Sequence, residues 1–194
     1  QADFAANKTY AGFAKFDPSY KGSIPAWQKL VNSMRLRLAM RLSKVAPSVA
    51  KTQGEKAMAD PAGLINTNAE NFLVSLNGNI MPVAQICFQW DDTRMGSVME
   101  SFLVGLKDNR ISKFFSPVTD PALYADHPTV PYKGIRNGAY CEAKADKVPY
   151  SKVSNDFNNA QTRRGFTASE VAFLKAEAAL RGWAGAGSAK TNYE

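Results

Sequence analysis

Apolar residues recur at three- and four-residue steps between residues 23 and 45, the spacing of one face of an α-helix. The stripe consists of Trp27, Leu30, Val31, Met34, Leu38, Leu42 and Val45, and Leu36 and Met40 widen the apolar face. Ser23 is a suitable N-cap, Pro25 suits the first turn because its missing N–H is not needed there, and Pro47 ends the run. The pattern predicts a packed helix near residues 24–45 with this stripe buried.

Three further segments have the spacing of a capping box, in which a hydroxyl and a carboxylate three residues later satisfy free N–H groups at a helix start. They are Thr52–Glu55, Ser97–Glu100 and Thr167–Glu170. The apolar residues that follow predict a short helix ending before Pro61, a helix near residues 98–106 and a helix near residues 168–182.

The segments between these helices have a different composition. Residues 80–88 are an apolar, extended-looking stretch in which Pro82 restricts any strand to a sheet edge. Residues 116–165 are rich in Pro, Gly, Asn, Asp and Tyr and lack a helical period, which indicates a long irregular loop region. With 194 residues, of which 45% are hydrophobic, the chain can bury one core, so we expect residues 1–194 to form a single unit.

The net charge of +7 is concentrated at one end, since residues 1–50 carry +6. Most of this excess comes from basic residues on the first predicted helix, among them Arg35, Arg37 and Arg41. Three interpretations of that basic face are open: a solvated surface, a salt-bridge face or a phosphate-binding face. We expect the three arginines to serve architecture, with buried stems and paired guanidinium groups, and we expect no nucleic-acid partner.

Motifs of known catalytic or metal sites are missing from the sequence, which contains no GxSxG, HExxH, P-loop or GxGxxG pattern. Cys87 and Cys141 lack the spacing of a zinc site, and the single histidine, His127, lies in a proline-flanked loop. The neighbouring carboxylates of Asp91 and Asp92 suit turn hydrogen bonds or an ion pair with Arg94 better than paired acid and base catalysis. We therefore expect no enzyme activity, no metal and no cofactor.

Loop aromatics beside polar groups provide a candidate binding surface, because a sugar ring presents an apolar face together with hydroxyl groups. The candidate ligand-binding residues are Trp90, Asp92, Tyr124 and Tyr132, on loops near residues 88–94 and 122–140. The alternative interpretation is that each aromatic ring only fixes its loop to the helical layer.

Four ordered motifs resemble the SusD/RagB-like family of outer-membrane lipoproteins. Residues 27–42, WQKLVNSMRLRLAMRL, are similar to the family helix W-x-K-(F/L)-x-N-S-L-R-L-R-L-A-M-R. Residues 97–111 resemble a short helix followed by D-P-R-L, with Asn109 in place of the proline, and residues 132–138 resemble the Y-K-G-I-x-x-G loop. Residues 168–183 match the element (A/S)-E-V-x-F-L-x-A-E-A-x-x-R-G-W.

The resemblance implies a mainly α-helical fold with tetratricopeptide-like helix pairs and long irregular loops. It also implies a lipid-anchored protein on the outer face of the outer membrane of a Bacteroidetes-type bacterium. Such a protein captures an oligosaccharide or another nutrient without catalysis, for polysaccharide utilisation, and passes it to a SusC-like TonB-dependent transporter. No family motif identifies the ligand contacts residue by residue.

The chain begins at Gln1 without an initiator Met and contains neither an 18-residue apolar run nor a signal-like segment. We therefore expect an internal, incomplete fragment of a SusD-like domain, with the lipid anchor outside it. Two other functions stay open. One is a helical-repeat scaffold that binds a protein partner, which buried loop aromatics and an exposed helical groove would favour. The other is a glycan hydrolase, which would need two convergent carboxylates in one cleft.

Overall fold

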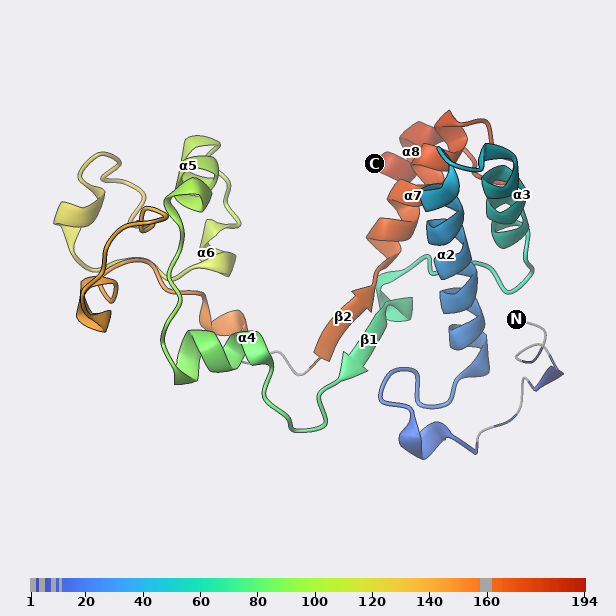
Figure 1. Ribbon diagram of the computed structural model, residues 1–194, viewed down its shortest axis with the longest axis horizontal. Coiled ribbons are helices and arrows are strands. Elements are labelled where there is room, and N and C mark those ends of the chain that lie inside the picture. Colours follow the sequence, from blue (N-terminus) through green and yellow to red (C-terminus); the bar gives the residue numbers. More distant parts are fainter. Residues whose placement is uncertain (1–2, 4–5, 8–9, 11, 158–161) are drawn as a thin grey trace. The chain divides into compact units, whose positions relative to one another are not determined.

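The computed structural model describes residues 3, 6–7, 10, 12–157 and 162–194. The chain divides into two compact units: unit 1 comprises residues 1–77 and 162–194, and unit 2 comprises residues 78–161. Unit 1 contains the long helices, whereas unit 2 is built from short helices and irregular segments (Figure 1). The described part is mainly α-helical, as the sequence predicts. Among its helices, none combines the length and the apolar character that crossing a membrane requires.

The first two long helices of unit 1 form an antiparallel pair, as Figure 1 shows. Helix α2 (Ile24–Leu42) begins as predicted, with the Ser23 hydroxyl accepting a hydrogen bond from the N–H of Ala26, but it ends at Leu42, before Val45. Helix α3 (Pro47–Met58) starts at Pro47, because proline suits the first helical position. The capping box predicted at Thr52–Glu55 is therefore wrong, since both residues lie inside α3.

The buried face of α2 differs from the predicted stripe. Leu30 is buried as expected, but Met34 and Leu38 are 43% and 60% exposed, while Leu36 is fully buried. The Leu36 side packs into a core with α3 and the C-terminal segment, whose members are Leu36, Ala39, Met40, Ala50, Ala57, Ala178, Trp183 and Ala186. Met34 and Leu38 instead line a surface hollow of about 590 Å³. Because α2 is apolar on both sides, packing partners decide which side is buried.

Two arginines of α2 serve the architecture, as predicted. The Arg37 guanidinium donates two hydrogen bonds of 2.6 Å to the Glu170 carboxylate and lies 3.7 Å from the centre of the Phe166 ring. Arg35 donates to the amide oxygen of Gln53, which joins α2 to α3. Arg41 is exposed. Part of the basic face of α2 thus forms hydrogen bonds and an ion pair within unit 1.

Unit 1 also contains the two-stranded antiparallel sheet of β1 (Phe72–Ser75) and β2 (Thr162–Phe166), with Phe72 opposite Phe166 and Ser75 opposite Thr162. The chain leaves unit 1 after β1 and returns with β2. It then forms α7 and α8 (Ala168–Leu180 and Ala189–Tyr193).

Helix α7 begins at the predicted cap, since the Thr167 hydroxyl accepts a hydrogen bond from the N–H of Glu170. The second half of the predicted capping box is wrong, because the Glu170 carboxylate binds Arg37 and does not return a bond to the cap. Trp183, which follows α7, packs closely against Gly54 of α3. A Cβ added to Gly54 would lie 2.3 Å from the Trp183 ring.

Unit 2 contains α4 (Pro82–Ala84), a π-helical turn (Gln85–Gln89), α5 (Ser97–Gly105) and α6 (Ile111–Phe114). The extended conformation expected for residues 80–88 is wrong, since Pro82 starts a helix there and a short apolar run fits either conformation. Short 3₁₀ turns at Pro121–Tyr124, Lys144–Asp146 and Asn155–Phe157 are the helical elements described within residues 116–157.

Backbone hydrogen bonds fix the irregular segments of unit 2 to the start of α5. Met95 donates to the Ser151 carbonyl and accepts from the N–H of Ile135, both at 2.8 Å, and Ser97 donates to the Ile135 carbonyl. Gly134 approaches so closely that an added Cβ would lie 2.6 Å from the carbonyl carbon of Gly96. The long loop region is therefore irregular but anchored to this helix.

Candidate functional site

A buried carboxylate on α5 anchors the segment of residues 127–134. Glu100 is 8% exposed, and its Oε2 accepts a hydrogen bond of 2.8 Å from the N–H of Gly134. Its Oε1 lies 2.9 Å from His127 Nε2 and 3.0 Å from Lys133 Nζ. Burial favours the protonated acid, but the bonds from His127, Gly134 and Lys133 outweigh it and lower the pKa of Glu100. The capping role predicted for Glu100 is therefore wrong: α5 has Gly96 at its N-cap and no side-chain cap.

The geometry around His127 favours the charged imidazolium form. Nε2 faces the Glu100 carboxylate, and Nδ1 lies 2.9 Å from the Val130 carbonyl oxygen. Both partners are acceptors, so both ring nitrogens must donate. Burial lowers the pKa of His127, but the hydrogen bonds to Glu100 and Val130 raise it by more, and the net shift is upward. His127 is therefore a structural cation and not a free loop histidine.

The carboxylates of Glu100 and Asp126 and the His127 ring lie close enough together to be considered as metal ligands. However, Lys133 Nζ lies 3.0 Å from an oxygen of each carboxylate and supplies the positive charge between them. We assign this cluster to loop anchoring and assign no metal to it.

A hollow of about 680 Å³ lies in unit 2 beside this cluster, within the size range of small-molecule pockets. We call it the α5–α6 hollow, and its lining residues are Leu103, Val104, Lys107, Asp108, Asn109, Ile111, Ser112, His127, Thr129, Val130 and Tyr132. The anchored segment of residues 127–132 forms one wall. Glu100 and His127 therefore hold that wall in position.

Two of the four candidate residues lie at or next to this hollow. Tyr132 lines it, and Tyr124 stacks on His127, with ring centres 6.5 Å apart and planes 16° from parallel. Both tyrosines are half-buried. Tyr124 is thus a support for the wall, whereas Tyr132 faces the cavity itself.

Trp90 and Asp92 form a separate surface on the chain that follows the π-helical turn. The Trp90 side chain is exposed, and the Asp92 carboxylate lies 3.3 Å from Lys147 Nζ. No hydrogen bond or ion pair of the described residues joins Trp90 or Asp92 to the α5–α6 hollow. Of the four candidates, Tyr132 is therefore the one that lines the α5–α6 hollow.

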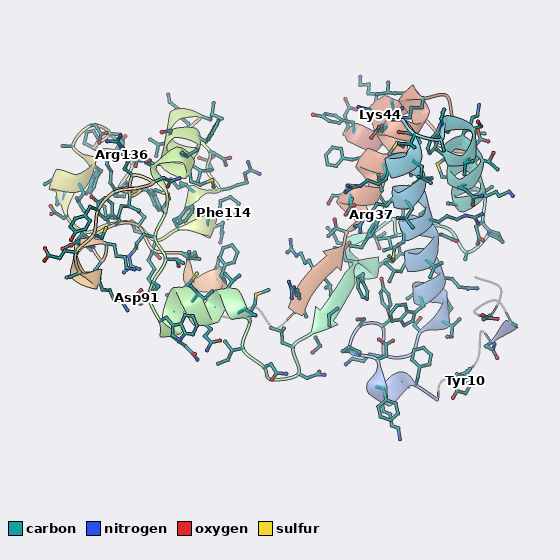
Figure 2. The ribbon with its side chains drawn as sticks, in the orientation of Figure 1. Tyr10, Arg37, Lys44, Asp91, Phe114 and Arg136 are labelled. Carbon is teal, nitrogen blue, oxygen red and sulfur yellow. The ribbon has the colours of Figure 1, made fainter. Side chains whose placement is uncertain are left out.

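Between Trp90 and Asp92, Asp91 is a structural residue, and Figure 2 labels its position in unit 2. It pairs with the buried guanidinium of Arg94 at 3.0 Å and with Lys152 at 2.8 Å. Hydrogen bonds from these two groups lower the pKa of Asp91 to about 2. The ion pair expected with Arg94 is present, and both cysteines, Cys87 and Cys141, are free.

Sequence reasoning missed Glu100 and the structural role of His127. A signal for Glu100 was present, because it is the only charged residue in the otherwise apolar or small-residue segment SVMESFLVG of α5. A lone carboxylate in such a helix needs partners, and here they come from residues 127–134.

Comparison with known proteins identifies the class and then the family. The fold defines a helical protein that carries a loop-rich unit with a pocket. A family model described as Susd and RagB outer membrane lipoprotein matches residues 2–194. The chain belongs to this SusD-like family, which places the protein among outer-membrane lipoproteins. Comparison with the curated proteins gave no match.

Solved structures agree with this assignment. A chitin-binding SusD homolog from Flavobacterium johnsoniae is 33% identical, with a TM-score of 0.81, and the match covers 99% of this chain and 39% of that protein. SusD homologs from Bacteroides thetaiotaomicron and Bacteroides vulgatus are 32% and 31% identical, with TM-scores of 0.79 and 0.78. These two matches cover 99% of this chain and 39% and 38% of those proteins. The chain thus spans about two fifths of the length of these relatives.

Proposed function

We propose that the complete protein captures a glycan at the cell surface and passes it to a SusC-like TonB-dependent transporter. Membership in the SusD-like family and the pocket of unit 2 carry this proposal. Two similar structures are described as chitin-binding, one of them 33% and the other 28% identical to this chain, so acetamido sugars are the first ligands to test. The ligand contacts include the loops near residues 88–94 and 122–140, with Trp90, Asp92, Tyr124 and Tyr132 as candidates.

A role in binding without catalysis agrees with the state of the carboxylates around the α5–α6 hollow. Asp108, the only acidic residue that lines it, accepts hydrogen bonds from the Arg110 side chain. Glu100 behind the wall is bound by three donors. Glycan hydrolysis requires two carboxyl groups across the scissile bond, and these two are committed to other partners.

A helical-repeat scaffold is the second candidate function, favoured by the exposed apolar side of α2. Met34 and Leu38 line a hollow there, and Val45 is 85% exposed. The exposure of Trp90 favours glycan capture instead, because a ring that only fixed its loop would be covered. Both surfaces belong to the same chain, so a scaffold role for unit 1 and a capture role for unit 2 are compatible.

Calorimetric titration of the full-length protein with a panel of oligosaccharides tests capture, and co-purification with a SusC-like transporter tests delivery. We expect saturable binding to at least one oligosaccharide, with no product released on prolonged incubation. Released shorter products would refute the non-catalytic role. Absence of binding across the panel, together with co-purification of a different protein, would favour the scaffold.

A further inference from the structure

The α5–α6 hollow combines an apolar floor with a polar rim. Buried Leu103 and Ile111 contribute the floor, together with half-buried Val130. Such a floor accommodates a methyl group or the apolar face of a sugar ring, and the rim must then satisfy the polar groups of the same ligand.

Four polar side chains of the rim are free to do this. Among the described residues, Lys107, Asn109, Thr129 and Tyr132 have no hydrogen-bond or ion-pair partner for their side chains. They offer an ammonium donor, an amide that donates and accepts, and two hydroxyls. An acetamido group has one N–H and one carbonyl, which matches the amide and the other donors, and its methyl matches the floor.

The remaining charges at this site are neutralised, which points to a neutral ligand. His127 is bound to Glu100, and Asp108 is bound to Arg110. Besides His127, unit 2 has nine basic and nine acidic side chains, so its net charge is +1 with a charged His127 and zero with a neutral one. A strongly anionic ligand would find only the Lys107 ammonium unpaired on the rim.

The backbone of Lys107 has a conformation that is unfavourable for a lysine. Its φ of 53° is in the left-handed region, where it closes α5: Lys107 donates to the Val104 carbonyl, and Asp108 donates to the Leu103 carbonyl. Glycine normally occupies this position because it lacks the Cβ that makes the conformation unfavourable. A lysine here is less stable than glycine would be, and its ammonium lies at the rim.

We propose that the α5–α6 hollow binds one N-acetylhexosamine residue of the captured glycan, with Lys107, Asn109, Thr129 and Tyr132 recognising its polar groups. This inference rests on the proposed function, which it deepens by naming the sugar class and the contacting residues. Asn109 and Tyr132 determine specificity, because both line the hollow and neither side chain has a competing hydrogen-bond partner among the described residues.

Two matched ligands test the sugar class in the full-length protein. The β-1,4-linked hexamers of N-acetylglucosamine and of glucose differ only in the 2-substituent of each ring. We expect the acetamido hexamer to bind at least about tenfold more tightly. Equal affinity for both hexamers, or preference for the glucose hexamer, overturns the proposed sugar class.

Three variants test the location. Asn109→Ala and Tyr132→Phe each remove one hydrogen-bonding group, and we expect each to weaken binding of the acetamido hexamer by roughly 2- to 10-fold. Tyr193→Phe, at a 73% exposed ring in unit 1, is the control and leaves the affinity unchanged. Lys107→Gly should weaken binding and at the same time raise the melting temperature, since it relieves the left-handed backbone.

Lys21→Gly is the matched control for this last variant. Lys21 in unit 1 has the same φ of 53°, so its replacement should raise the melting temperature without changing the affinity. Wild-type protein that binds the hexamer while Asn109→Ala, Tyr132→Phe and Lys107→Gly all bind equally well overturns this site but leaves capture intact. Wild-type protein that binds no glycan of the panel overturns the proposed function itself.

Discussion

The side chain of Glu100 joins three different donors to α5, and each comes from the segment of residues 127–134. Removing one partner of a buried ion pair leaves the other charge buried without compensation. The resulting loss of folding free energy exceeds the stabilisation that the intact pair provides. The stability of the pocket wall therefore depends on the charge states of Glu100 and His127.

The pH dependence of unfolding tests this dependence. The pKa of His127 is raised in the folded state. The residue therefore contributes its full stabilisation at a pH below its unfolded-state pKa, and this stabilisation is lost as the pH rises through the folded-state pKa. The lowered pKa of Glu100 acts in the opposite direction, with its contribution lost as the pH falls. We expect the free energy of unfolding, measured in urea, to fall as the pH rises above about 6.5, the ordinary pKa of histidine.

The variant His127→Gln provides the comparison, because its side chain does not titrate. We expect it to be less stable than the wild type near pH 6 and to approach the wild type near pH 9. A constant stability difference across the range would show that His127 is not the titrating group.

The exposed ring of Trp90 gives a prediction about binding. If it stacks on the glycan, Trp90→Ala should weaken binding in the full-length protein by about 1–3 kcal/mol, with a melting temperature close to that of the wild type. Tyr124→Ala should lose stability as well, because its ring supports His127. Affinity unchanged for Trp90→Ala in titration calorimetry would remove this ring from the site.

Residue types predicted that Trp90 and Tyr132 lie outside the core helices, because proline-, glycine- and asparagine-rich segments seldom enter a core. They left open whether the Trp90 ring is exposed or covered. They could not predict Glu100, whose local spacing from Ser97 suggested a helix cap. Its partners lie 27 to 34 residues away in the sequence, and a local rule contains no information about them.

At the level of the elements, α2 has two apolar sides, and the tertiary packing of α3 and α7 determines which one is buried. Leu36→Ala in the 194-residue chain should therefore cost about 2–5 kcal/mol, since its side chain is fully buried. Leu38→Ala, at 60% exposure, should cost less than about 1 kcal/mol. Urea denaturation of the two variants measures the difference, and equal losses would contradict this orientation of α2.

Helix α3 provides a test in which packing opposes helix propensity. Replacing a helical glycine by alanine normally stabilises a helix by about 1 kcal/mol. Gly54→Ala should instead destabilise by about 1–3 kcal/mol, because the new methyl would meet the Trp183 ring. Gly105→Ala at the end of α5 is the control, since no atom lies within 4 Å of its added Cβ, and thermal unfolding should show opposite signs for the two variants.

Periodicity and capping signals predicted where α2, α5 and α7 lie, because these signals are local. They failed at α3, where Pro47 both follows one helix and starts the next, and at Pro82, which starts a helix in an apolar run. In each of these cases the same residue type fits two local structures, and contacts from outside the segment select one of them.

Considering the whole molecule, the net charge of +7 lies entirely in unit 1. Part of it is internal, since Arg37 is paired with Glu170 and Lys29 with Glu70. We expect DNA and RNA to bind no more tightly than about micromolar at physiological salt, measured by fluorescence anisotropy. Sub-micromolar affinity that is lost in the variant Arg37→Glu would contradict the architectural role of that helix face.

The antiparallel pairing of β1 and β2 places Ser75, close to where the chain leaves unit 1, opposite Thr162, where the chain returns to unit 1. A segment that starts and ends at two paired strands can be exchanged as one piece. The pairing of β1 with β2 and the helical core of unit 1 both remain intact when the residues between the strands are replaced. Under the proposed function, recombination at these two strands would transfer a ligand specificity between relatives in a single event, without rebuilding the helical framework.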